Sequence, residues 1–62
     1  MKTIKVNDMS CMHCVKKIQT SLLANGVDGN IDLMNHEVEV NERDINTAVE
    51  AIKAAGFTPE IW

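Results

Sequence analysis

The residues with the clearest chemical potential are Cys11 and Cys14, which are separated by two residues. Thiolates are soft ligands, and a pair that converges from one short segment suits a soft ion such as Cu(I). The same spacing occurs in thiol–disulfide exchange proteins, so redox chemistry is an alternative. A structural disulfide is disfavoured because it would close a very small loop. The pair therefore predicts a metal site first.

Several neighbours of the pair have side chains that could assist it. Met9 could be a sulfur ligand, but methionine more often fills gaps in a core, and we expect Met9 to be buried. Met12 lies between the cysteines and should be exposed. His13 is a candidate third ligand, or a group that tunes the thiolates, since neutral imidazole binds metals well. The ligand set that we predict remains Cys11 and Cys14.

A helix is expected to position the second cysteine. It should run from about Cys11 or Met12 to Asn25, with Gly26 in a left-handed conformation after it. The unpaired N–H groups and partial positive charge of a helix N-terminus favour thiolates, and nearby lysines would add to this effect. The apolar residues that recur at helical spacing are Val15, Ile18 and Leu22.

The rest of the chain alternates between strand and helix signals. Period-two patterns predict strands, whereas apolar residues at helical spacing predict the second helix. Asp44, Asn46 or Thr47 could cap that helix, with Glu50 completing a capping box after Thr47. Gly56 should end it. The predicted strands are Lys2–Asp8, Val27–Leu33, Glu37–Val40 and Phe57–Trp62.

The resulting βαββαβ order predicts a ferredoxin-like α+β fold. Right-handed crossovers give a four-stranded antiparallel sheet in the order 4-1-3-2 with both helices on one face. Pro59 cannot donate a hydrogen bond to a central ladder, so it fits the edge position of the last strand. The cysteine loop, the Met34–His36 hairpin and the Gly56–Phe57 junction should share one end of the sheet.

Two residues at that end have less certain chemistry. His36 lies in the hairpin, and we expect it to be exposed to solvent rather than to bind metal. Phe57 should pack beside the metal loop and shield it from water.

Size and composition limit the classes of function. A chain of 62 residues is one domain, residues 1–62, and it is too short to add a catalytic cleft to its scaffold, so we do not expect an enzyme. A net charge of −3 and only two aromatics, Phe57 and Trp62, argue against nucleic-acid binding. No apolar run approaches the about 20 residues that span a bilayer, so we expect no membrane insertion and a cytoplasmic location.

The motif Met9-x-Cys11-x-x-Cys14 after a first strand, in a βαββαβ chain of this size, resembles the heavy-metal-associated domains. That family includes cytosolic copper chaperones, metal-binding domains of copper- and zinc-transporting P-type ATPases, and a bacterial mercury-binding protein. The resemblance implies that Cys11 and Cys14 are the metal ligands and that Met9 anchors the loop. His13 also occurs in bacterial copper carriers of the family. Asp8 departs from the glycine that is common before the methionine.

The resemblance implies a cytosolic metallochaperone that carries Cu(I) and transfers it by thiolate exchange to the metal-binding domain of a P-type transport ATPase. A carrier of Zn(II), Cd(II) or Hg(II), a domain excised from a transport ATPase, and a thiol–disulfide redox protein remain alternatives. Family copper chaperones often carry tyrosine or lysine where Phe57 stands, and ATPase domains often carry phenylalanine. We expect a free-standing protein that is a monomer without metal, with a metal-bridged dimer as the alternative state. The expected docking residues are Met12, His13, Lys16, Lys17 and Phe57.

Overall fold

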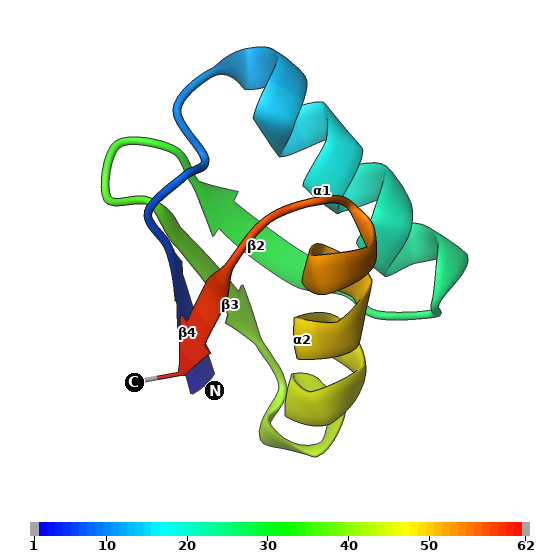
Figure 1. The fold of residues 1–62 in the computed structure, drawn as a ribbon. Helices are drawn as coiled ribbons and strands as arrows, with labels where there is room; N and C mark the ends of the chain where they lie inside the picture. The colour runs from blue at the N-terminus through cyan, green and yellow to red at the C-terminus, as the bar shows by residue number, and fades with distance from the viewer. Residues whose placement is uncertain (1, 62) are drawn as a thin grey trace.

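The computed structural model describes residues 2–61, which form a four-stranded sheet and two α-helices (Figure 1). Trp62, which we predicted to end the last strand, lies outside the described residues. The elements in chain order are β1 (Lys2–Val6), α1 (Met12–Ala24), β2 (Gly29–Asp32), β3 (Glu37–Val40), the 3-10 turn η1 (Glu42–Asp44), α2 (Ile45–Ala54) and β4 (Pro59–Ile61).

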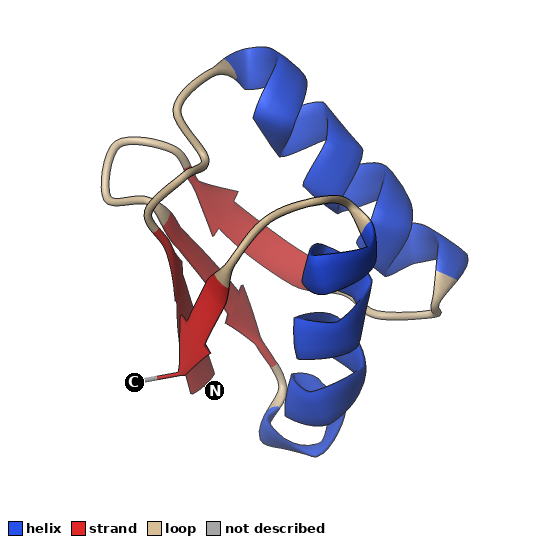
Figure 2. Ribbon diagram, viewed as in Figure 1, coloured by secondary structure: helices blue, strands red, loops and turns tan. Residues whose placement is uncertain are grey.

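The sheet has the order β2-β3-β1-β4, and each neighbouring pair is antiparallel. Both helices cover the same face (Figure 2). This arrangement confirms the predicted ferredoxin-like fold and its 4-1-3-2 strand order. Pro59 lies opposite Val6 on the edge strand β4, where its missing N–H leaves no central ladder incomplete.

The core fills the space between the sheet and the helices. Alternation along the strands turns one set of side chains toward the helices, and the helical stripes meet it. The hydrophobic residues that are buried are Ile4, Val6, Met9, Ile18, Leu22, Val27, Val38, Val40, Ala48, Ala51 and Ile52. Met9 is the one that comes from the loop between β1 and α1, so this loop is tied directly to the core.

Glycines end both helices as predicted. Gly26 has φ 72° and Gly56 has φ 95°, a left-handed region that other residues enter at a cost. Asp44, one of the three predicted caps, is the N-cap residue of α2, although its side chain makes no capping hydrogen bond. The capping box predicted at Thr47 is wrong, because Thr47 and Glu50 lie within the helix. The chain already turns in η1, where the Asp44 N–H donates to the Asn41 carbonyl at 2.9 Å, so the helix starts earlier.

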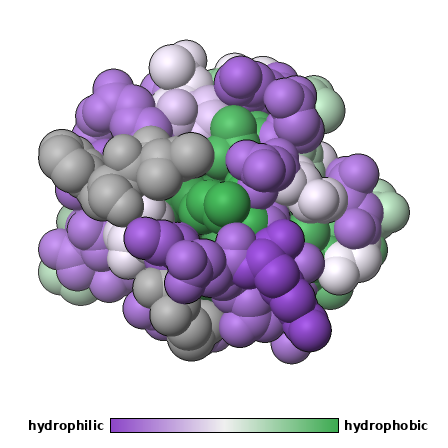
Figure 3. Space-filling view, turned by 90° about the horizontal axis from the view of Figure 1, so that it is seen from below, coloured by the Kyte–Doolittle hydropathy of each residue, from purple (hydrophilic) through white to green (hydrophobic). Residues whose placement is uncertain are grey.

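The end of the molecule away from the β1–α1 loop carries mostly hydrophilic side chains around a small hydrophobic area (Figure 3). Across residues 2–61, every helix falls short of the length and apolar character needed to traverse a bilayer.

Candidate metal centre

Met9 anchors the loop between β1 and α1 in the core, two positions before Cys11. Met9 is 0% exposed, and its N–H donates to the Val6 carbonyl at 3.1 Å. The expectation that Met9 is a core residue is therefore confirmed. Because the thioether fills the core, it is not turned toward the exposed end of the loop.

The two cysteines occupy different backbone environments at the start of α1. Cys11 is the extended N-cap, with φ −150° and ψ 167°, and its side chain is exposed. Cys14 lies in the first helical turn and is half-buried against the core. Their Sγ atoms are 3.2 Å apart, and both thiols are free. One sulfur thus belongs to the helix, and the other lies on the extended residue that precedes it.

The surroundings of Cys11 favour its thiolate. The hydrogen bond from the Cys14 thiol is the largest cause that lowers the pKa of Cys11, and the backbone amides of Cys14 and His13 act in the same direction. The positive charge of Lys17 lowers the pKa further. The backbone amides of His13 and Cys14 are first-turn N–H groups that a helix leaves without internal partners.

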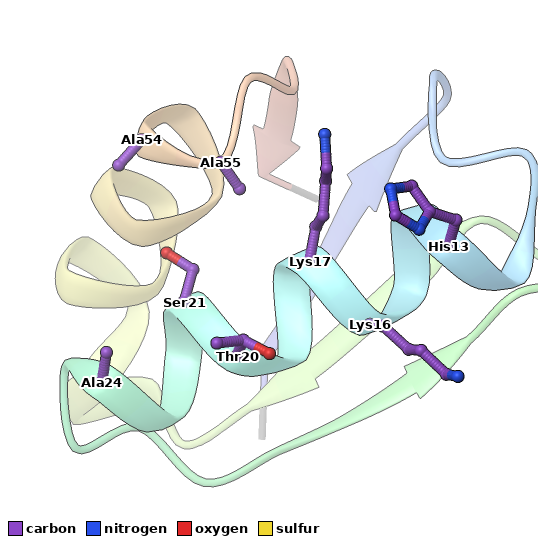
Figure 4. Close-up of a pocket in the computed structure, with 8 residues that line it drawn as sticks. All are labelled: His13, Lys16, Lys17, Thr20, Ser21, Ala24, Ala54 and Ala55. Atoms are coloured by element: carbon purple, nitrogen blue, oxygen red, sulfur yellow. The ribbon is translucent and has the colours of Figure 1, made fainter.

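The described residues provide no third ligand beside the cysteines. Within residues 2–61, no three His, Cys, Asp or Glu side chains gather closely enough to hold a metal ion. His13 is exposed and lines a shallow groove between α1 and α2, which has a volume of ≈ 530 Å³ (Figure 4). The other residues of this groove are Lys16, Lys17, Thr20, Ser21, Ala24, Ala54 and Ala55.

Asp8 links the loop to a distant part of the chain. Its carboxylate oxygens accept hydrogen bonds from the Thr58 backbone N–H, at 3.1 and 3.3 Å. Thr58 lies in the junction between α2 and β4, so the carboxylate joins two of the segments that were expected to share this end of the sheet. Sequence reasoning missed this contact, because 50 positions separate the partners and no local pattern connects them.

His36 is the main correction to the sequence-based site. We expected it to be exposed, but it is half-buried. Its Nδ1 lies 2.5 Å from the Met9 carbonyl oxygen, and its own carbonyl accepts a hydrogen bond from the Val6 N–H at 2.7 Å. The β2–β3 hairpin therefore contacts the β1–α1 loop (Figure 1). The prediction failed because strand alternation does not describe the turn residues.

The remaining predicted site residues are Met12 and Phe57. Met12 is 61% exposed, which confirms its expected position on the surface beside the cysteines. Phe57 is half-buried and packs against the core, and its N–H donates to the Ile52 carbonyl at 3.2 Å. It thus helps to join the end of α2 to β4.

The sequence matches the family model of the heavy-metal-associated domain over residues 3–58. The chain belongs to this family. A search of curated proteins found no match. Among solved structures, the yeast copper transporter domain Ccc2a, described in apo and Cu(I)-loaded states, is 33% identical with a TM-score of 0.80, over 98% of this chain and 92% of that one.

Two further solved structures share the fold at lower identity. The copper chaperone Atx1 from Synechocystis PCC6803 is 19% identical with a TM-score of 0.77, over 94% of this chain and 97% of that one. A gold-binding protein is 20% identical with a TM-score of 0.84, and the match covers 100% of both chains. The heavy-metal-associated domain thus accounts for essentially all of the fold described above.

Proposed function

We propose that this heavy-metal-associated domain carries one soft metal ion, Cu(I), between the sulfurs of Cys11 and Cys14 and passes it to a similar domain of a P-type transport ATPase. The observation that carries the proposal is the pair of sulfurs 3.2 Å apart at an exposed helix start. With no third ligand gathered beside them within residues 2–61, the ion would stay open to an incoming thiolate.

The metal would have to separate the sulfurs. With metal–sulfur bonds of about 2.3 Å, the sulfurs would be about 3.8 Å apart at a tetrahedral angle and about 4.6 Å apart in a linear arrangement. The present 3.2 Å is shorter than either. Cys14 belongs to a helix and packs against the core, whereas Cys11 is exposed and precedes the helix. Cys11 is therefore the arm that would move outward to admit the ion.

Transfer would proceed by ligand exchange. A thiolate of the acceptor bonds to the ion first, one cysteine of the carrier leaves, and a second acceptor thiolate then displaces the other. Cys11 is the better first leaving group because it is the more exposed of the two. Its lowered pKa favours the thiolate that must capture the ion again if transfer fails.

The surface around the cysteines supports docking of an acidic partner. His13, Lys16 and Lys17 belong to the N-terminal half of α1 and line the groove between α1 and α2. Met12 is exposed beside the sulfurs. The charge on this face contrasts with the net charge of −3 of the whole chain. Electrostatic attraction of this kind speeds encounter more than it adds affinity, so added salt should slow transfer.

The likeness to a copper transporter domain and to a copper chaperone also favours copper. The gold-binding protein fits the same preference for soft ions. Zn(II) prefers four tetrahedral ligands, so two cysteines alone would leave it with two other ligands to find. Cd(II) and Hg(II) remain to be separated by measurement.

The decisive experiment is a competition titration with Cu(I), Zn(II) and Hg(II) in a thiol buffer, combined with X-ray absorption of the bound form. Wild-type protein should take one equivalent of Cu(I) with two sulfur ligands. Cys11→Ser and Cys14→Ser should each lose tight binding, while Ser10→Ala, which alters the same loop and keeps both thiols, should not. Retention of tight Cu(I) binding by both serine variants would show that the site is elsewhere. Catalysed insulin reduction by the metal-free protein would instead favour redox exchange.

A further inference from the structure

We infer that His36 is a positioning residue of the metal loop, because its Nδ1 bonds to the Met9 carbonyl and holds the segment that delivers Cys11. This inference rests on the proposed function for its effect on metal, since it concerns the same pair of cysteines. Among the hydrogen bonds of residues 2–61, none joins His36 to either sulfur, so His36 acts through the backbone of the loop.

Three contacts hold the loop at Met9. Its side chain is buried, its N–H donates to Val6, and its carbonyl meets His36. Only Ser10 separates it from Cys11. The Val6 contact comes from the end of β1, whereas the carbonyl contact comes from the β2–β3 hairpin. Loss of that contact would free the Met9–Ser10 peptide to rotate.

The hairpin holds His36 in a conformation that few side chains accept. His36 has φ 55°, and histidine, asparagine and aspartate are enriched among the non-glycine residues found there. The Val6 N–H donates to its carbonyl at 2.7 Å, which joins the turn to the end of β1. The Asp32 carboxylate accepts hydrogen bonds from the Asn35 backbone and side-chain N–H groups at 3.2 and 2.7 Å, which tightens the same turn. These hydrogen bonds fix the turn from which the His36 imidazole reaches the Met9 carbonyl.

The contact also determines where the imidazole proton lies. A carbonyl oxygen only accepts hydrogen bonds, so Nδ1 must carry the hydrogen. In the neutral ring this leaves Nε2 without a proton. The tautomer of His36 is therefore a direct spectroscopic reading of the contact, independent of any metal.

The expected effect on metal binding follows from preorganisation. If only part of the population has the binding-competent loop, the apparent Kd rises by the inverse of that fraction. The worth of one ordinary hydrogen bond sets the scale, so removing the His36 side chain should weaken Cu(I) binding about three- to tenfold. Substitution of a cysteine ligand should cost far more.

Two variants separate the hydrogen bond from the backbone strain. His36→Gly accepts the positive φ and removes the donor, whereas His36→Asn also accepts the positive φ and places its Nδ2 donor where the histidine Nδ1 stands. Cu(I) affinity is measured by competition with a chromophoric chelator, and hydrogen exchange is measured at the Ser10 and Cys11 amides of the metal-free protein. His36→Gly should weaken Cu(I) affinity about three- to tenfold and speed exchange of the two amides. His36→Asn should keep both the affinity and the exchange rates near those of wild type.

Nitrogen-15 chemical shifts of His36 in metal-free wild-type protein supply the independent arm. A neutral ring protonated at Nδ1 supports the inference, and one protonated at Nε2 overturns it. Unchanged Cu(I) affinity and unchanged amide exchange in His36→Gly would overturn it as well. If wild-type protein binds no Cu(I), the proposed function fails, while the tautomer and the amide exchange still decide whether His36 positions the loop.

Discussion

Replacement of Met9 tests whether this residue anchors the β1–α1 loop or serves as a ligand of the proposed metal ion. Its side chain is 0% exposed, so Met9→Ala removes about three non-hydrogen atoms from the core and leaves a cavity. Substitutions of this kind cost about 2–5 kcal/mol of unfolding free energy. A domain of 62 residues has about 3–9 kcal/mol in total, so the alanine variant should lose a large share of its stability.

The matched variant is Met9→Leu, which keeps nearly the same apolar volume and lacks sulfur. It should cost less than about 1.5 kcal/mol. At about 4–8 °C of melting temperature for each kcal/mol in a domain of this size, alanine should lower the melting temperature by at least about 8 °C and leucine by less than about 12 °C.

Thermal unfolding followed by circular dichroism measures these changes, and chelator competition measures Cu(I) affinity in the same samples. Met9→Leu should bind Cu(I) within about twofold of wild type, because a buried thioether contributes packing rather than a ligand. The reasoning is refuted if leucine weakens Cu(I) binding as severely as a cysteine substitution does. A loss below about 1 kcal/mol in Met9→Ala would equally show that the anchor is unimportant.

Two further predictions concern the sheet and its hairpin. A Cβ on Gly29 would lie 2.9 Å from a methyl carbon of buried Val40, so Gly29→Ala should destabilise the domain by about 1–3 kcal/mol in urea unfolding, and Val40→Ala in the same chain should relieve part of that loss. Full additivity of the two changes would argue against the clash. Hydrogen bonds from the Asn35 side chain and backbone lower the pKa of Asp32 below its ordinary value of 3.8. The stability that the Asp32 carboxylate contributes is therefore fully present above pH 3.8, and it is lost as the pH falls through the lower folded-state pKa. The stability difference between wild type and Asp32→Asn should therefore shrink between pH 7 and strongly acidic pH in urea unfolding, and a difference that does not vary with pH would contradict this assignment.

Local patterns in the sequence carried most of the fold. Helical spacing and glycine predicted that α1 ends before Gly26, and strand alternation predicted β3 with its observed bounds, Glu37–Val40. These signals depend on which face of an element is buried, and that is written into neighbouring residues. The capping box at Thr47 failed because several polar residues in a row could each begin a helix, and the turn in η1 selected among them.

The sequence by itself determined that Cys11 and Cys14 would start a helix, because both residues and the helix signal belong to one continuous segment. It also indicated that Met9 would be buried. Only the tertiary structure decided what braces this loop, since Asp8 meets Thr58 across 50 positions and His36 meets Met9 across 27. Such contacts form where three separate turns converge at one end of a sheet, and they depend on turn conformations that no periodic pattern encodes.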